Sequence, residues 1–245
     1  MKRLAQADGL LWLTLRPIAH RGLHDMAGKD PQMPENTLAS FQQAVEHDYA
    51  IECDLQISAD GVPVVFHDDT LDRLTSETGP VRSRTAAELV AMPILSSGET
   101  IPALSDMLEQ VAGAVPLVIE LKSIPGENDG FAQAVADGLR DYSGPVAVMS
   151  FDAGLAAQVM GAAPSLPVAL VGEGGLGTTF QHLAAIIRHG FHFLSFSLTD
   201  LPAPAPLIAR WILGLPLICW TVRTPQDAAK ARRWTGQITF EGIRP

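Results

Sequence analysis

The feature that most constrains the fold of this chain is the alternation of strand-like and helix-like segments along almost its whole length. Short runs rich in β-branched and aromatic residues are separated, in most cases, by segments whose apolar residues recur with helical spacing. The nine runs span residues 16–22, 50–58, 62–68, 116–122, 145–152, 166–172, 192–198, 216–222 and 237–242. Such alternation is typical of a parallel sheet covered by helices, and about eight units in 245 residues predict a (β/α)₈ TIM barrel of the α/β class.

Two segments depart from this regular pattern. Only Ala59, Asp60 and Gly61 separate the second and third runs, which is a turn signal too short for a helical crossover. Either the barrel is irregular there or one run is not a barrel strand. Residues 69–103 hold turn residues and one short helical pattern, over Thr85–Met92. We expect a small inserted subdomain over one mouth of a single domain spanning residues 1–245, the alternative being a meandering surface loop.

Composition limits the partners and the compartment of the protein. Hydrophobic residues make up 47% of the chain, and the net charge is −10. That excess of acid disfavours nucleic acid as a partner, because no surplus of bases is present to displace counterions from phosphates. The only cysteines, Cys53 and Cys219, each lie inside an apolar run and are expected to be buried free thiols in a reducing compartment.

The N-terminal segment MKRLAQADGLLWLTLRP begins with basic residues and then becomes apolar. Gln6, Asp8 and Gly9 interrupt the apolar region, and the remaining run Leu10–Leu15 is too short for a signal peptide. No stretch approaches the ~18–20 apolar residues of a spanning helix, so we expect a cytoplasmic protein without a transmembrane segment. We expect Trp12 to plug the base of the domain, the alternative being contact with a membrane surface.

Side chains that carry chemistry gather at the ends of four of the nine runs. They are His20, Arg21, Glu52, Asp54, His67, Glu120 and Lys122. Functional groups of a (β/α)₈ barrel collect at the C-terminal ends of the strands, so these groups should converge. The alternative is a buried network of ion pairs, but desolvating so many charges is often not repaid by pairing alone.

Three of these groups are acids that point to one hard cation. In the run 50–58, Glu52 and Asp54 share a face opposite apolar Ile51, Cys53 and Leu55, so the acids should point inward. Two residues along a strand span roughly 6.5–7 Å, which lets both carboxylates reach one ion. Glu120 ends the run 116–122, and ligands that are all carboxylates favour Mg²⁺ or Ca²⁺ over zinc.

Three further residues are weaker candidates for the site. Glu35 is expected on the loop after the first run as a partner of Arg21 or the metal. The alternative is that its segment only starts a helix, capped by Asn36 or Thr37. Phe151 and Trp220 end the fifth and eighth runs and could form an apolar wall of the substrate site, or be ordinary core aromatics.

Several short motifs, in this order and spacing, resemble those of the glycerophosphodiester phosphodiesterase family. They are AHRG (19–22), PENT (34–37), IECDLQISADGVPVVFHDDTLDRLT (51–75), IELK (119–122), SFD (150–152) and WTV (220–222). The resemblance implies a (β/α)₈ barrel with a small insertion. It also implies hydrolysis of a small-molecule glycerophosphodiester to sn-glycerol 3-phosphate and an alcohol, with one divalent cation.

The resemblance also implies roles for the site residues. Glu52, Asp54 and Glu120 would hold the metal, His20 and His67 would be general base and acid, and Arg21 and Lys122 would bind phosphate oxygens. Imidazoles suit the roles of general base and general acid, because their ordinary pKa of ~6.5 lets them accept and donate protons near neutral pH. The implied mechanism begins with attack by the glycerol 2-hydroxyl on phosphorus, and water then opens the cyclic phosphate.

The chain departs from the family pattern at two positions. Arg223 follows WTV where members often have asparagine, and TFEG (239–242) stands where many have a Thr-Asp ending. We expect neither to touch the metal or the histidines, and both to bear on the preference for the alcohol.

Two other functions remain open: a lysophospholipase D for acylated glycerophosphodiesters, and a non-catalytic module that binds glycerophosphodiesters. The choice of Mg²⁺ or Ca²⁺, the leaving alcohol and the oligomeric state stay open as well.

Overall fold

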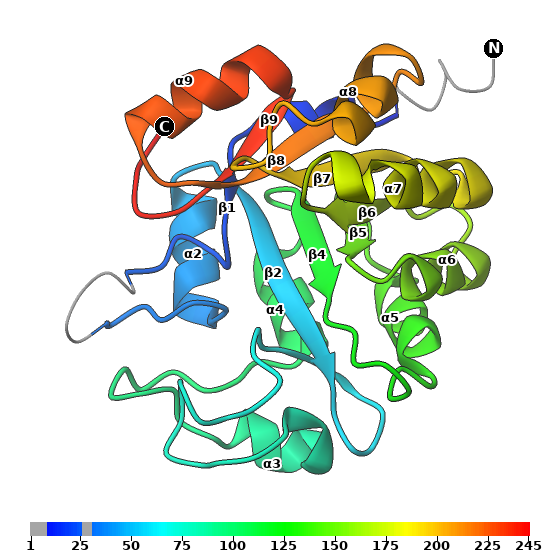
Figure 1. The fold of residues 1–245 in the computed structure, drawn as a ribbon. Helices are drawn as coiled ribbons and strands as arrows, with labels where there is room; N and C mark the ends of the chain where they lie inside the picture. The colour runs from blue at the N-terminus through cyan, green and yellow to red at the C-terminus, as the bar shows by residue number, and fades with distance from the viewer. Residues whose placement is uncertain (1–8, 26–30) are drawn as a thin grey trace.

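The computed structural model describes residues 9–25 and 31–245 and contains a closed barrel of eight parallel strands (Figure 1). The barrel closes because the first strand pairs with both the second and the last. The strands are β1 (Ile18–Ala19), β2 (Ala50–Ile57), β3 (Pro63–Val65), β4 (Leu117–Leu121), β5 (Val146–Ser150), β6 (Val168–Gly172), β7 (Phe193–Ser197), β8 (Leu217–Val222) and β9 (Gln237–Phe240). The prediction of a (β/α)₈ barrel is therefore confirmed.

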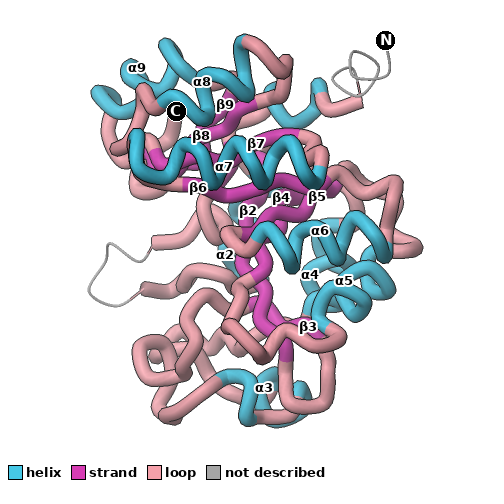
Figure 2. The backbone as a smooth tube through the Cα atoms, turned by 45° about the vertical axis from the view of Figure 1, so that its right-hand side comes forward, coloured by secondary structure: helices cyan, strands magenta, loops and turns pink. Residues whose placement is uncertain are grey.

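Helices connect most of the strands and cover the outside of the barrel (Figures 1 and 2). They are η1 (Leu11–Thr14), α2 (Leu38–Glu46), η2 (Val81–Ser83), α3 (Ala86–Val90), α4 (Leu104–Val111), α5 (Phe131–Leu139), α6 (Ala153–Ala162), α7 (Leu176–His189), α8 (Pro204–Trp211) and α9 (Pro225–Trp234). Local sequence fixes their starts: Thr37 caps α2 by accepting a hydrogen bond from the backbone N–H of Ser40, and Thr224 caps α9 in the same way.

The irregularity after the second strand is a hairpin. Strand β3 runs antiparallel to β2, with Leu55 opposite Val65, and it has no other strand neighbour within the described residues. The run 62–68 is therefore not a barrel strand, which decides between the two interpretations that the sequence left open. The short turn at residues 59–61 permits only this antiparallel return.

The first barrel strand is much shorter than the run 16–22 that predicts it. After Ala19 the chain turns, because Arg21 and Gly22 both have positive φ, at 56° and 78°. Glycine is required at the second position, since a Cβ there would lie 2.4 Å from Ser40 Oγ. The turn places the side chains of His20 and Arg21 at the mouth of the barrel.

Residues 69–103, which contain η2 and α3, extend beyond the end of β2 (Figures 1 and 2). The helical pattern expected over Thr85–Met92 is present as α3. The segment packs with the end of the β2–β3 hairpin in an apolar cluster separate from the barrel core, formed by Val64, Phe66, Leu71, Leu74, Val81, Leu89, Met92, Ile94 and Ile101. Its backbone is therefore held by its own buried side chains as well as by the barrel.

Successive residues of each strand face opposite sides of the barrel wall. On β2, Ile51, Cys53 and Leu55 pack against the helices, while Glu52 and Asp54 face the interior. Leu10 and Leu13 are buried against the inward-facing apolar residues of the strands, with Trp12 packed on the same cluster. The segment thus plugs the base of the barrel.

The N-terminal prediction is only partly covered by the structure. Residues 1–8, which include Gln6 and Asp8, lie outside the described residues. In the remaining chain, none of the helices combines the length and the apolar character that a bilayer crossing requires.

Candidate active site

A cavity of about 400 Å³ lies at the C-terminal ends of the barrel strands, where enzymes of this architecture have their active sites. Its lining includes all but one of the residues singled out from the sequence. They are His20, Arg21, Glu52, Asp54, His67, Glu120, Lys122, Phe151 and Trp220. The exception is Glu35, which is buried behind Arg21. Residues up to 200 positions apart in the chain therefore meet in one place.

Three carboxylates form the centre of this site. Strand register explains their convergence, because Asp54 of β2 pairs directly with Glu120 of β4, and Glu52 precedes Asp54 on the same face. One oxygen from each residue lies within 4.8 Å of the others, and all three side chains are buried. Opposite ligands of one ion are separated by twice the metal–oxygen distance, about 4.6–5.2 Å for Ca²⁺ and about 4.0–4.2 Å for Mg²⁺. The cluster could therefore hold one hard divalent cation.

The electrostatics of the three carboxylates are strongly perturbed. Burial, reinforced by Asp54 and Glu120, raises the pKa of Glu52 well above its usual range. Burial also raises the pKa of Glu120, against the opposing effect of Lys122. Burial alone would raise the pKa of Asp54, but Lys122 and Arg21 outweigh it and hold that pKa below its usual range. The side chains around Glu52 leave its negative charge poorly compensated, which is the situation that a bound cation relieves.

Two basic side chains lie directly on the carboxylates. Lys122 Nζ is 2.9 Å from Asp54 Oδ1 and 2.5 Å from Glu120 Oε1. Arg21 Nε is 3.3 Å from Asp54 Oδ2, and the backbone N–H of Arg21 donates to Glu52. The sequence prediction placed Lys122 on a phosphate, whereas here its ammonium pairs with two acids. Positive charge is thus concentrated beside the carboxylates in a protein whose net charge is −10.

Glu35 holds arginine side chains and does not reach into the cavity. Its Oε1 accepts from Arg21 at 2.7 Å and from Arg73 at 2.7 Å. Burial alone would raise the pKa of Glu35, but the two arginines outweigh burial and lower that pKa. The alternative interpretation is also satisfied, because Thr37 caps α2. Sequence reasoning missed Arg73, which comes from the insertion and fixes the position of Glu35.

Asn36 is a second residue that the sequence reasoning undervalued. Its side-chain N–H donates to Asp54 Oδ2 at 2.9 Å, and its side-chain oxygen accepts from the backbone N–H of Asp54 at 3.2 Å. Its φ of 57° lies in the left-handed region, which asparagine tolerates better than most residues. The PENT motif carried the signal, but only the structure shows that its asparagine orients a carboxylate of the triad.

Each of the two histidines is hydrogen-bonded by a carboxylate that an arginine supports. His67 Nδ1 lies 2.7 Å from Asp68 Oδ1, and Arg73 Nε donates to Asp68 Oδ2 at 2.6 Å. Burial lowers the pKa of His67, so its imidazole is held neutral at neutral pH. An ionised carboxylate can only accept, so Nδ1 carries a proton and Nε2 is the atom that remains free to accept one.

The second histidine, His20, has the same arrangement, with partners that the sequence analysis linked to the preference for the alcohol instead. His20 Nδ1 lies 3.0 Å from Glu241 Oε2, and Arg223 donates to the same oxygen at 2.8 Å. The hydrogen bond with His20 lowers the pKa of Glu241 to about 2. The expectation that TFEG does not touch the histidines is therefore wrong, because Glu241 contacts His20, whereas Arg223 is linked to His20 only through Glu241. The closing strand ends beside β1, which brings Glu241 next to His20.

Two aromatic residues border the charged part of the cavity. The rings of Phe151 and Trp220 meet edge to face, with centroids 5.6 Å apart, and Phe151 is 45% exposed. Trp220 Nε1 and Thr239 Oγ1 are buried, line the cavity and have no hydrogen-bond partner in the part of the chain that the structure describes. The site therefore offers an apolar wall and unused polar atoms beside its charges.

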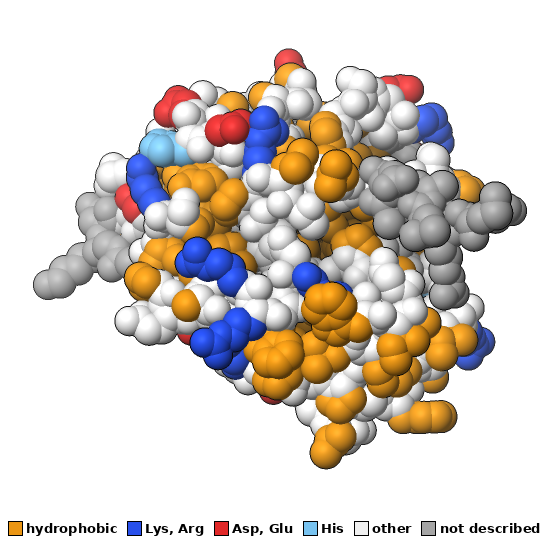
Figure 3. All heavy atoms as spheres, turned by 90° about the horizontal axis from the view of Figure 1, so that it is seen from above, with side chains coloured by type: hydrophobic (Ala, Val, Ile, Leu, Met, Phe, Trp, Pro, Cys, Tyr) orange, Lys and Arg blue, Asp and Glu red, His pale blue; other side chains and the backbone are white. Residues whose placement is uncertain are grey.

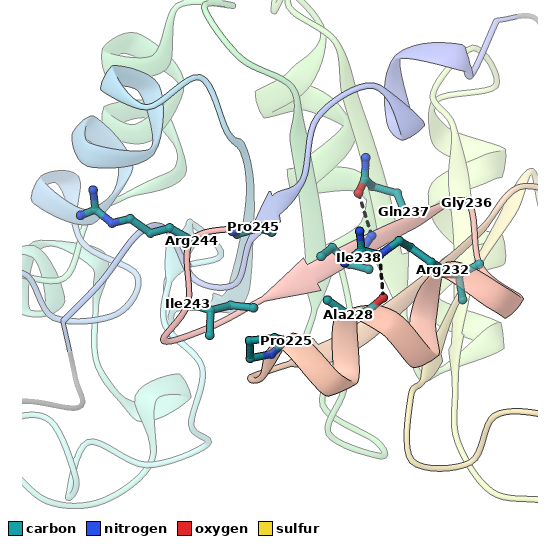
Figure 4. Close-up of a pocket in the computed structure, with 10 residues that line it drawn as sticks. Pro225, Ala228, Arg232, Gly236, Gln237, Ile238, Ile243, Arg244 and Pro245 are labelled. Atoms are coloured by element: carbon teal, nitrogen blue, oxygen red, sulfur yellow. Dashed lines mark hydrogen bonds between the residues drawn. The ribbon is translucent and has the colours of Figure 1, made fainter.

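Another cavity, of about 350 Å³, lies between α9 and the C-terminal segment (Figure 4). Its lining includes Arg232, Gln237, Ile238 and Arg244, and Figure 4 shows the Arg244 side chain pointing away from α9. None of the described residues that line it carries a carboxylate, imidazole or thiol. It lacks groups for proton transfer or metal binding, so the chemistry is assigned to the barrel mouth.

Comparison with known proteins agrees with this assignment. The model of the glycerophosphoryl diester phosphodiesterase family matches residues 20–237. YhdW of Bacillus subtilis is 31% identical over 224 residues, covering 87% of this chain and 88% of that protein. A glycerophosphodiester phosphodiesterase of Caldanaerobacter subterraneus is 29% identical over 222 residues, covering 86% of each. The structure of an Oleispira antarctica phosphodiesterase, in complex with the product sn-glycerol-3-phosphate, superimposes with a TM-score of 0.80 at 24% identity, covering 93% of this chain and 94% of that one.

Proposed function

The chain belongs to the glycerophosphoryl diester phosphodiesterase family and is a phosphoric diester hydrolase, and from that premise we propose its substrate, cofactor and mechanism. The proposed reaction converts a glycerophosphodiester to sn-glycerol 3-phosphate and an alcohol, with one divalent cation. The observation that carries the proposal is the convergence of three carboxylates and two imidazoles in one cavity. The product bound to the Oleispira antarctica enzyme agrees with this substrate class.

Glu52, Asp54 and Glu120 are the proposed ligands of the cation, either Mg²⁺ or Ca²⁺. Their oxygens fit a hard ion, and the raised pKa of Glu52 reflects burial beside two other acids that such an ion would offset. When bound, the cation would polarise a hydroxyl of the substrate and reduce the negative charge on the phosphoryl oxygens. Asn36 would keep Asp54 oriented through its two hydrogen bonds.

His20 and His67 are the proposed proton-transfer pair. One imidazole accepts the proton of the attacking glycerol 2-hydroxyl as its oxygen bonds to phosphorus. The other donates a proton to the departing alcohol oxygen as its bond to phosphorus breaks. The roles reverse when water opens the cyclic phosphate. Glu241 and Asp68 keep the Nδ1 proton of each ring in place, so that Nε2 carries out both transfers.

Arg21 and Lys122 are the proposed phosphate-binding residues. Both lie beside the triad, so they are placed to pair with the phosphoryl oxygens of a diester bound there. Glu35 would act through Arg21, whose guanidinium it holds at 2.7 Å. Arginine presents a planar fork and lysine a point charge, so the two would bind different oxygens of one phosphate.

Phe151 and Trp220 are proposed to contact the carbon atoms of the glycerol, because they form the apolar wall of the cavity.

The insertion is proposed to belong to the same catalytic domain of residues 1–245, since Arg73 links it to Glu35 and Asp68. The buried free thiols of Cys53 and Cys219 support a reducing, cytoplasmic location.

The proposal is tested by measuring release of sn-glycerol 3-phosphate from glycerophosphocholine, glycerophosphoethanolamine and glycerophosphoglycerol. We expect activity to disappear after treatment with a chelator and to return with Mg²⁺ or Ca²⁺. Release that a chelator does not reduce would contradict the metal dependence. Faster turnover of lysophosphatidylcholine would favour a lysophospholipase D, and tight binding without turnover under any cation would favour a binding module.

A further inference from the structure

Large apolar side chains are exposed together on the outer surface of two neighbouring helices, α7 and α8. Leu176 is 82% exposed, Phe180 84%, Ile187 70%, Trp211 67% and Ile212 74%. We call these five residues the apolar face. Figure 3 shows the molecule from above, with apolar side chains crowded at the lower right, in the direction of α7 and α8 in Figure 1. Single exposed apolar residues are ordinary, but a contiguous group of this kind marks an interaction surface.

The part of the face on α7 follows helical periodicity. Leu176, Phe180 and Ile187 stand at positions i, i+4 and i+11, which brings all three to one side of the helix. Half-buried Leu183, at i+7, lies between the two sides of the helix and packs against the barrel core. The buried residue Ile186 lies on the side that faces the barrel. Helix α7 therefore has a second apolar stripe, directed away from the core, which packing of the barrel does not explain.

The charge around the apolar face differs from that of the whole chain. The protein has 27 acidic residues against 17 basic ones, yet neither α7 nor α8 contains an acid. From residue 174 to residue 226 the sequence has one acidic residue, Asp200, which accepts a hydrogen bond from the backbone N–H of Gly174. Arg188 lies beside Ile187 in sequence, and the Arg210 guanidinium stacks over the Trp211 ring at 4.9 Å. Within the two helices, therefore, the charged neighbours of the apolar side chains are bases, which is typical of a surface that meets an anionic partner.

We propose that the apolar face docks on an anionic lipid bilayer. Tryptophan, phenylalanine and leucine enter the interfacial region of a bilayer, and neighbouring arginines pair with anionic head groups. The net charge of −10 does not prevent this contact, because charges more than about 8–10 Å away are screened at physiological salt. A second copy of the chain fits less well, since symmetric pairing of this face would bring arginines together with no acid on either helix to match them.

The face begins next to the active site. Glu173 lines the catalytic cavity, and Leu176 is the first residue of α7 after the loop that follows it. Docking would therefore hold the rim of the barrel mouth close to the lipid surface. The binding itself is independent of the proposed reaction, because no residue of the face belongs to the catalytic machinery.

The test is sedimentation of the full chain with vesicles of phosphatidylcholine alone and with vesicles of equal parts phosphatidylcholine and phosphatidylglycerol. We expect binding only to the second kind. The double variant Phe180→Ser, Trp211→Ser should bind at least about tenfold more weakly. Arg188→Glu should weaken binding at least about fivefold. Matched controls outside the face are Leu95→Ser and Arg140→Glu, both at exposed positions, and they should bind like the wild type.

Each variant should keep its thermal unfolding midpoint, because the altered side chains are exposed. Equal binding to both kinds of vesicle, or binding that the face variants leave unchanged, would overturn the proposal. So would a wild-type dimer in light scattering that the double variant converts to monomer without any vesicle binding. That result would assign the face to a second copy of the chain.

Discussion

The two ends of the barrel interior are built from the same strands but from opposite kinds of side chain. On β1, inward-facing Ile18 at the base is followed two residues later by His20 at the mouth. On β2, Ala50 is followed by Glu52, and on β4 Val118 is followed by Glu120. One step of the strand period thus changes the interior from apolar to charged.

This change separates stability from chemistry. At the base, Leu10 and Leu13 complete a cluster of buried apolar side chains, which needs no charged or polar partner. At the mouth, burial raises the pKa of Glu52 and Glu120, so the acids there oppose folding until charge is supplied. We therefore expect changes at the base to affect unfolding and changes at the mouth to affect turnover.

The largest effect is expected from His67→Ala at the mouth. Loss of one proton-transfer group should reduce kcat by about 10²–10⁴-fold, measured as release of sn-glycerol 3-phosphate. The unfolding midpoint should change little, because the His67 side chain is 30% exposed. His47→Ala, an exposed imidazole outside the cavity, is the control and should retain full activity. Equal activities in the two variants would remove His67 from the mechanism.

The next largest effect is expected from Leu13→Ala at the base. Leu13 is 2% exposed, and a cavity in its place should lower the free energy of unfolding by about 2–5 kcal/mol, measured by urea denaturation. Turnover of the folded fraction should stay unchanged. Leu11→Ala on the same short helix, at a site 62% exposed, should cost less than about 0.5 kcal/mol. A large loss of kcat in folded Leu13→Ala would break the separation of the two ends.

A smaller effect is expected from Glu241, which touches His20 and not the proposed reaction centre. Glu241→Ala should reduce kcat by about 10–100-fold with little change in KM, because it orients a catalytic ring. Glu241→Gln should recover part of the loss, since its amide oxygen still accepts from Nδ1. A change confined to KM would indicate a role in binding the alcohol, as the sequence analysis expected.

The smallest effect is expected for the thiols of Cys53 and Cys219, which are buried in the apolar layer between the barrel strands and the helices. Burial raises the pKa of the Cys219 thiol to about 11, so it stays protonated at pH 8. Mass spectrometry after iodoacetamide treatment should find Cys53 and Cys219 unmodified in native protein and alkylated in urea. Rapid alkylation of the native protein would show that this layer opens in solution.

The sequence predicted the barrel and most of the site because both follow short-range rules. Alternation of strands and helices fixes the architecture, and the rule that function lies at strand ends brings His20, Glu52, Asp54, His67 and Glu120 together. The sequence also implied the meeting of the acids, because inward-facing acids near the ends of two neighbouring parallel strands, β2 and β4, lie side by side.

What the sequence did not predict depends on contacts between distant segments. Glu241 meets His20 only because the last strand closes the barrel against the first. Arg73 reaches Glu35 only because the insertion returns over the mouth. No local pattern encodes these pairings, since each depends on the assembled barrel.

The most direct test of the account is titration calorimetry of Ca²⁺ and Mg²⁺ into chelator-treated protein. The account predicts one ion per chain, no binding in Asp54→Asn, and wild-type binding in Asp141→Asn, which removes an exposed acid far from the triad in sequence. Absence of binding to the wild type, or unchanged affinity in Asp54→Asn, would contradict the claim that acids from two neighbouring strands share one cation.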